Sequence, residues 1–269
     1  MPKDIHVIVV EDDLYARDLM SLLLNRDWRT RVVAEVGNQE ALESALVDAH
    51  TRVDAVLLDT EVPNDPEWAF RLADVVRSIP NPPAVLCIAT KPDTETLSRL
   101  LEGSYSGYAL KKEVGYALAA AVTHASKYKN WVMTKSVYQL ALRQRLPIPE
   151  NAILLDGNKP AAPFTPREEE IARLAVLFNL AHRDLSDELL IRADQVSKYV
   201  SSVYDKLGLD QILSGDIEAE TIFQDKVLLR HFKNILDRVA KSKSRRKTAD
   251  MATLAFHLLT MPEIREDIF

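Results

Sequence analysis

The sequence predicts an α/β fold for its first half and an all-α fold for its second half. Five short apolar runs alternate with helical patterns up to residue 127, and beyond residue 164 only helical patterns remain. The apolar runs are nearly continuous, which is typical of parallel strands buried on both faces. We therefore expect a five-stranded, parallel, doubly wound sheet followed by an all-α C-terminal domain, in a chain of 269 residues that is long enough for two domains.

The predicted strands and helices follow one another in strict alternation. The strands are runs rich in Val, Ile and Leu, at 5–10, 32–36, 53–58, 84–89 and 107–110. Apolar residues recur at helical spacing at 14–25, 39–49, 68–77, 94–102 and 114–126. Strands joined in this way by single helices favour a parallel sheet covered on both faces.

The pattern changes after residue 127. The next 36 residues contain several prolines and no strand alternation, so we expect a linker there, with one helix near residues 137–145. The expected boundaries are 1–127 for the α/β domain, 128–163 for the linker, 164–212 for a first group of helices and 213–269 for a helical C-terminal extension.

Composition and charge exclude several classes of protein. The chain is 47% hydrophobic and 28% charged, as globular proteins are, and its net charge of −6 gives no overall reason to bind nucleic acid. Its single cysteine, Cys87, lies within an apolar run and is expected in the core. We find no signal-peptide pattern and no apolar run of the roughly 18–20 residues that span a bilayer, so we expect a cytoplasmic protein without a membrane segment.

Polar side chains follow the predicted strands at their carboxyl ends, where ligands bind in open parallel sheets. Glu11 and Asp12 follow the first strand, Asp59 the third, Thr90 the fourth and Lys111 the fifth. Crowded carboxylates repel one another, and a hard divalent cation such as Mg²⁺ offsets this repulsion by taking oxygen ligands. Asp59 is then a candidate nucleophile that holds a phosphoryl group, with Lys111 and Thr90 bonding to the phosphoryl oxygens.

Residues 4–127 resemble the receiver domain of two-component response regulators. The resemblance rests on Val-Val-Glu-Asp-Asp at 9–13, Leu-Leu-Asp-Thr-Glu-Val-Pro at 57–63 and Ser-Gly-Tyr-Ala-Leu-Lys at 106–111. It implies that Asp59 is the phosphoacceptor, Lys111 the phosphate-pairing lysine and Tyr108 the aromatic switch residue. It also implies Mg²⁺ held by Glu11, Asp12, Asp59 and the backbone carbonyl of Glu61. The implied phosphoryl donor is a sensor histidine kinase, and the chain is expected to be a regulator and not an enzyme.

Two positions depart from the receiver pattern. Counting back without a gap from the Ser-Gly-Tyr triplet, the usual Ser or Thr position falls on Ala89, with Thr90 one place later. Lys111 is followed by Lys112, where proline is common. Two other interpretations stay open: the acids could be solvated strand ends or helix caps, or a phosphatase could use Asp59 with Glu61 as a loosely fitting general acid.

Residues 164–210 resemble the LuxR-type helix-turn-helix. They open with Phe-Thr-Pro-Arg-Glu at 164–168, which predicts a helix capped by Thr165 and Glu168, and close with Tyr-Asp-Lys-Leu-Gly at 204–208. The resemblance implies a recognition helix, DNA as a partner and a homodimer. By position, the DNA-contacting residues of that helix are Gln195, Ser197, Lys198 and Tyr199.

Charge leaves two hypotheses for this second half. Residues 164–210 carry nine Asp or Glu against six Lys or Arg, and DNA affinity depends mainly on phosphate contacts. In the first hypothesis, a transcription regulator binds DNA with the help of a basic patch in the tail that includes Arg245, Arg246 and Lys247. In the second, the degenerate helix-turn-helix docks on another protein and does not contact DNA.

Overall fold

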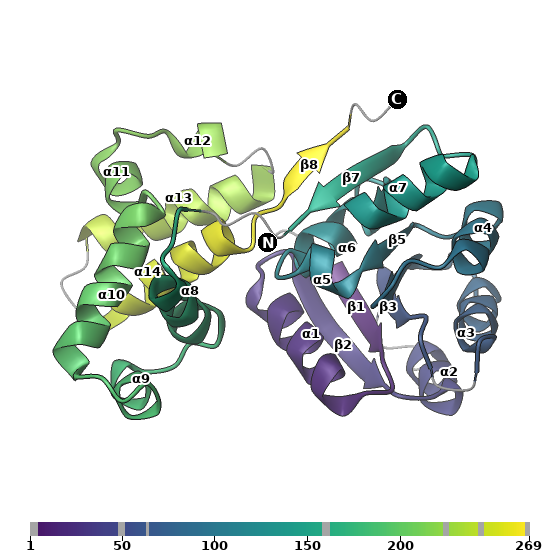
Figure 1. Ribbon diagram of the computed structural model, residues 1–269, viewed down its shortest axis with the longest axis horizontal. Coiled ribbons are helices and arrows are strands. Elements are labelled where there is room, and N and C mark those ends of the chain that lie inside the picture. The colour runs from purple at the N-terminus through teal and green to yellow at the C-terminus, as the bar shows by residue number, and fades with distance from the viewer. Residues whose placement is uncertain are drawn as a thin grey trace. The chain divides into compact units, whose positions relative to one another are not determined.

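The structure is a computed structural model that divides the chain into two compact units (Figure 1). It describes residues 5–47, 52–62, 65–157, 162–222, 226–241 and 245–266, without the side chains of 227, 228, 238–241 and 245–249. The first unit comprises Met1–Lys159 and Pro262–Phe269, and the second comprises Pro160–Met261.

The first unit is built on one sheet with the strand order β2-β1-β3-β4-β5-β6-β7-β8. The strands are β1 (Ile5–Val10), β2 (Thr30–Val36), β3 (Ala55–Asp59), β4 (Ala84–Ala89), β5 (Gly107–Leu110), β6 (Trp131–Met133), β7 (Ala152–Asp156) and β8 (Glu263–Arg265). Neighbouring strands from β2 to β7 are parallel, and β8 alone pairs antiparallel, with β7. An α/β fold with a mostly parallel sheet is therefore confirmed.

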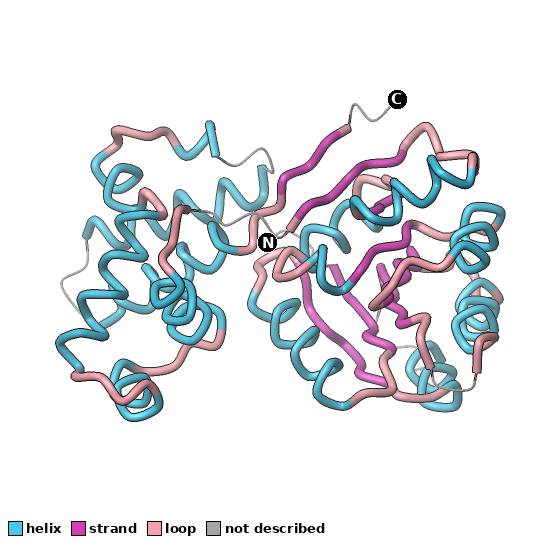
Figure 2. Tube along the Cα trace, in the orientation of Figure 1, coloured by secondary structure: helices cyan, strands magenta, loops and turns pink. Residues whose placement is uncertain are grey.

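Helices cover both faces of this sheet, as Figures 1 and 2 show. One face packs against α1 (Leu14–Arg26) and α6 (Leu118–Ser126). The other packs against α2 (Gln39–Val47), α3 (Trp68–Arg77), α4 (Thr94–Glu102) and α7 (Lys135–Gln144). A single helical turn, α5 (Lys111–Val114), follows β5 directly.

The central strands are largely apolar because the sheet is packed on both faces. In β3, Leu57 belongs to the core under α1 and α6, whereas Leu58 belongs to the core on the opposite face. Both side chains are fully buried, and burial of such a side chain contributes about 1.5–3 kcal/mol. Cys87 is buried in the same way in β4.

The sheet has eight strands and not the five that we expected, which corrects the prediction for residues 128–163. That segment, predicted as a linker, instead contributes β6, α7 and β7 to the sheet. The predicted helical extension at 213–269 also ends differently, because β8 pairs with β7 in the first unit. A strand of three residues, such as β6 or β8, is too short to show any periodicity in the sequence.

The described regular elements of the second unit are all helices, joined by loops (Figure 2). It comprises α8 (Pro166–Ile171), a π-helical turn η1 (Ala172–Leu177), α9 (His182–Glu188), α10 (Ala193–Lys206), α11 (Leu209–Ser214), α12 (Ala219–Ile222), α13 (Lys226–Lys241) and α14 (Arg245–Leu259). The capping box of Thr165 and Glu168 begins α8, as the sequence predicted. Within the described parts of the chain, we find no helix with the length and apolar character needed to cross a membrane.

Candidate functional site

The carboxyl ends of β1 and β3 meet at the point where the strand order of the first unit reverses. The chain steps from β1 to β2 on one side and to β3 on the other, and ligands bind at such switch points. The register pairs Val10 with Leu58, so Glu11 and Asp59 lie one residue further along at the same edge. Asp13 then caps α1 by accepting a hydrogen bond from the amide of Ala16 at 2.7 Å, so the helix begins directly after the acidic residues.

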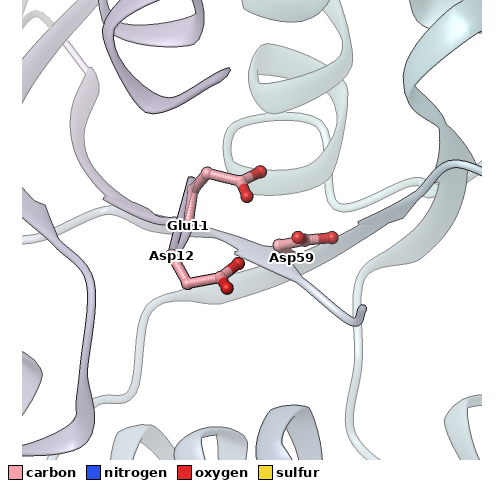
Figure 3. A group of neighbouring side chains, drawn as sticks. All are labelled: Glu11, Asp12 and Asp59. Atoms are coloured by element: carbon pink, nitrogen blue, oxygen red, sulfur yellow. The ribbon is translucent and has the colours of Figure 1, made fainter. Parts of the chain in front are cut away.

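Three carboxylates gather at this edge (Figure 3). Glu11, Asp12 and Asp59 each have an oxygen within 4.8 Å of the others. Glu11 and Asp59 are both 1% exposed, whereas Asp12 is exposed to solvent. We call this group the acid pocket.

Lys111 reaches the acid pocket from the end of β5. Its Nζ lies 2.7 Å from Glu11 Oε2 and 3.1 Å from Asp59 Oδ2. Burial lowers the pKa of Lys111, but the hydrogen bond that Lys111 donates to Glu11 and the charges of both carboxylates outweigh this and raise the pKa above its ordinary value. The ammonium group therefore stays charged between two buried acids.

The acid pocket holds more negative charge than Lys111 balances. Burial raises the pKa of Asp59 to about 7, with the charge of Lys111 acting against the rise and that of Glu11 adding to it. A donor set made only of carboxylate oxygens suits hard divalent cations. Glu11, Asp12 and Asp59 therefore fit a metal ion by their chemistry as well as by their spacing.

Glu61 turns its side chain away from the acid pocket. Its carboxylate accepts hydrogen bonds from the backbone amides of Thr90 at 2.5 Å and Lys91 at 3.3 Å, just after β4. Its own backbone amide donates to Asp59 Oδ1 at 3.3 Å. The side chain of Glu61 thus belongs to the loop after β4, and only its backbone stays beside Asp59.

Thr90 and Tyr108 lie on the β4 and β5 side of the pocket. Thr90 is exposed, and it follows Ala89, which pairs with Leu110 in the sheet. Thr90 therefore stands level with Lys111, although it is one place later than the usual hydroxyl position. Tyr108 is 1% exposed and its hydroxyl donates to the carbonyl of Lys91 at 3.2 Å. Burial raises the pKa of Tyr108, which keeps the phenol neutral.

Arg17 is a residue of the pocket that the sequence did not single out. Its Nη1 donates to the carbonyl of Glu11 at 2.7 Å, from the first turns of α1. This bond fixes the backbone at the point where β1 ends and the acids begin. Only its position four residues after the helix cap Asp13 could have indicated the contact.

Several known proteins are similar in sequence to this chain. The sensory transduction protein LytT of Bacillus cereus is 35% identical over 81 residues, which are 30% of this chain and 31% of LytT. This chain thus spans about a third of the length of the curated relatives that it matches first. Over longer stretches, the fimbriae Z protein of Salmonella typhimurium is 22% identical, covering 78% of this chain and 94% of that protein.

The DNA-binding transcriptional activator DevR/DosR of Mycobacterium tuberculosis is also similar. It is 25% identical over 208 residues, covering 77% of this chain and 90% of DevR/DosR. The resemblance to two-component response regulators is confirmed. No protein-family model matches the chain.

Solved structures of response regulators are also similar to this chain. The Salmonella typhimurium response regulator RcsB has a TM-score of 0.44 and 19% identity, covering 85% of this chain and 96% of that one. The isolated receiver domain of RcsB with a phosphomimetic beryllofluoride has a TM-score of 0.45 and 19% identity, covering 51% of this chain and 99% of that one.

The residues that the LuxR-type resemblance predicts to contact DNA lie on α10. Gln195, Ser197 and Lys198 are exposed, and Tyr199 is half-buried. The opposite face of α10 carries Val196, Val200 and Val203, which are buried in the second unit. Arg245, Arg246 and Lys247 lie in the first turn of α14, and their side chains are outside the described residues.

Proposed function

We propose that this chain is a response regulator in which Asp59 accepts a phosphoryl group from a sensor histidine kinase. In this proposal the second unit then controls transcription by binding DNA, and the protein acts in the cytoplasm. The observation that carries the proposal is the position of Lys111, whose Nζ lies within 3.1 Å of both Glu11 and Asp59 at the switch point of the sheet. Lone helix caps would not need an ammonium group there.

The proposed reaction transfers one phosphoryl group between two residues. A carboxylate oxygen of Asp59 attacks the phosphorus of a phosphohistidine, the P–N bond breaks, and the imidazole nitrogen leaves with the electron pair. The product is an acyl phosphate on Asp59. Lys111 can pair with the phosphoryl oxygens, and the Thr90 hydroxyl stands level with it.

Mg²⁺ is the cation that we propose for the acid pocket. Glu11, Asp12, Asp59 and the backbone carbonyl of Glu61 would hold it, and it would neutralise charge on the phosphoryl oxygens. Glu11 and Asp59 would also be less repelled by each other once a cation is bound.

We propose α1 as the docking site of the kinase. The helix begins directly after the acid pocket and exposes a row of apolar side chains, of which Leu14 is 54% and Tyr15 82% exposed. Leu19 and Leu22 continue the row at 40% and 36%. A partner that covers this face brings its phosphohistidine to the end of the sheet where Asp59 lies.

The proposed homodimer has to use a surface other than the edge of β5. In this chain β6 pairs with β5, and α7 packs against both α4 and β5. The face formed by α4 and β5 is therefore covered by the chain itself.

Phosphorylation of the full chain tests the proposal directly. We expect incubation with acetyl phosphate and Mg²⁺ to add the mass of one phosphoryl group to the wild type and none to Asp59→Asn. The half-buried Asp65 pairs with Arg71 outside the acid pocket, so Asp65→Asn is the matched control and should keep the mass gain. A mass gain that survives in Asp59→Asn would rule out Asp59 as the acceptor.

A further inference from the structure

The turn that follows Lys111 connects the acid pocket to two other parts of the first unit. Lys111 opens α5, a single turn closed by a hydrogen bond from the amide of Gly115 to the carbonyl of Lys111 at 3.0 Å. Gly115 has a φ of 52°, which a glycine adopts without strain. Because the turn is short and closed, its residues move together with Lys111.

The side chain of Glu113 holds the start of α7. One of its carboxylate oxygens accepts from the amide of Ser136 at 3.0 Å, and the other accepts from the Ser136 hydroxyl. Beside this contact, the buried Thr134 accepts a hydrogen bond from the amide of Leu110 at 3.1 Å. Glu113 thus satisfies an amide at the first turn of α7, and that helix packs against α4, β5 and β7.

The backbone of Glu113 holds the end of β7. Its carbonyl accepts a hydrogen bond from the amide of Gly157 at 3.0 Å. A Cβ atom on Gly157 would lie only 2.0 Å from the carbonyl oxygen of Val114, so the close approach requires glycine. Gly157 directly follows β7, and it is the last described residue before the chain leaves the first unit.

We propose that Glu113 is a positioning residue that couples the phosphorylation state of Asp59 to the point where the chain leaves the first unit. The proposal rests on the function proposed above. A phosphoryl group on Asp59 draws Lys111 toward its oxygens and away from Glu11, and α5 moves with Lys111. Glu113 carries this displacement to Ser136 through its side chain and to Gly157 through its carbonyl.

The residues after Lys111, which depart from the receiver pattern, have a role in this coupling. Receiver domains commonly have proline at that position, whereas this chain has Lys112 followed by Glu113. Glu113 contacts the start of α7 and the residue after β7, and both elements belong to the segment that extends the sheet beyond five strands. The turn therefore links the pocket to the part of the first unit that the receiver resemblance did not predict.

Hydrogen exchange of the full chain tests the coupling. Backbone amide exchange is measured by mass spectrometry for peptides covering 134–138 and 152–157, with and without beryllofluoride and Mg²⁺. In the wild type, we expect the ligand to change the exchange rate of the 134–138 peptide by about tenfold, the effect of one charge-assisted hydrogen bond. For the 152–157 peptide, where the bond is a neutral backbone one, we expect a change of about fivefold. In Glu113→Gln we expect a change below about twofold in the 134–138 peptide, because the carboxylate that binds Ser136 is gone. The 152–157 peptide should still respond, because Gly157 bonds to the backbone carbonyl of residue 113, and phosphorylation by acetyl phosphate should proceed as in the wild type.

A control and a second variant separate coupling from mere stability. Glu150 is exposed on the connection before β7, so Glu150→Gln should respond to beryllofluoride as the wild type does. Ser136→Ala removes only the hydroxyl contact, and it should weaken the response of the 134–138 peptide even if Glu113→Gln does not fold.

Different experimental results would overturn the proposed function and the proposed coupling. Absence of any mass gain from acetyl phosphate in the wild type would overturn the proposed function. A normal mass gain, with exchange at 152–157 unchanged by beryllofluoride in the wild type, would overturn the coupling alone. A wild-type response in both Glu113→Gln and Ser136→Ala would overturn it as well.

Discussion

Glu168 combines a helix cap with a buried contact between two helices. Its carboxylate accepts from Thr165 in the capping box, from Ser202 Oγ at 2.6 Å and from Lys206 Nζ at 2.6 Å, both on α10. The hydrogen bond from Lys206, followed by those from Ser202 and Thr165, lowers the pKa of Glu168 to about 2. The capping box was predicted from the sequence, but the contacts with α10 were not, because they join residues 34 and 38 positions apart.

The lowered pKa of Glu168 predicts an acid-sensitive second unit. The ionised carboxylate adds to the free energy of unfolding. This contribution is fully present above the ordinary pKa of 4.5 and is lost as the pH falls through about 2. We expect Glu168→Gln to lower the free energy of unfolding by about 1–2 kcal/mol at pH 7 and to flatten its dependence on pH between about 5 and 2. Urea unfolding followed by circular dichroism across this range measures both.

The neighbouring Glu169 is exposed and supplies the control. Glu169→Gln should keep the stability of the wild type and its dependence on pH. Parallel pH profiles for Glu168→Gln and the wild type would contradict the assigned cause of the pKa shift.

At the scale of elements, β8 protects the edge of β7. It pairs Leu155 with Ile264, and the half-buried Ile264 packs against the core under α1 and α6. An unpaired parallel strand such as β7 would otherwise expose its amides and carbonyls at the edge of the sheet. The chain therefore returns to its first unit after α14 and covers that edge.

A chain that ends at Met261 should have a weakened first unit. We expect the truncation to lower the free energy of unfolding of this unit by about 1–2 kcal/mol, from the lost burial of Ile264 and the lost strand pairing. Hydrogen exchange at Leu155 should become faster, while exchange in α10 stays as it was. The substitution Ile264→Ser, which keeps the strand, should give a smaller effect, and unchanged exchange at Leu155 in the truncated chain would contradict the role of β8.

The sequence predicted the elements that carry strong patterns and missed those that do not. The five strands up to Leu110 were predicted because each is a mostly apolar run followed by a helix. β6 and β8 have three residues each, and β7 lies among prolines with no helical pattern directly after it, so nothing marked them as one sheet. The positions of β6, β7 and β8 in the sheet depend on pairing between strands that are distant in the sequence, and a local sequence pattern does not encode such pairing.

The order of the strands also explains which contacts near the acid pocket could be predicted from the sequence. Glu11, Asp59 and Lys111 could be brought together from sequence, because the carboxyl ends of parallel strands share one edge of the sheet. The hydrogen bonds that Glu61 accepts from Thr90 and Glu113 accepts from Ser136 could not, since they join residues 29 and 23 positions apart whose side chains show no pattern in the sequence. Such contacts depend on how each loop turns and not on the order of the strands.

Over the whole molecule, acidic and basic residues are concentrated in different parts of the second unit's sequence. Residues 164–210 carry an excess of acids, whereas residues 226–247 carry nine Lys or Arg and a single Asp. DNA affinity is dominated by contacts between basic side chains and phosphates. If the second unit binds DNA, the basic residues of α13 and α14 have to supply most of these contacts, and α10 supplies few beyond Lys198.

This division predicts how DNA binding depends on salt. Each phosphate contact contributes about 0.9 to the slope of log affinity against log salt concentration. We expect the joint substitution of Arg245, Arg246 and Lys247 by Ala to lower that slope by about two to three, and Lys198→Ala to lower it by about one at most. Retention of a promoter fragment, titrated with salt on the full chain after phosphorylation, gives both slopes. Wild-type retention by the triple variant would show that the tail is not the phosphate-contacting patch, and an absence of salt-dependent retention in the wild type would favour docking on another protein.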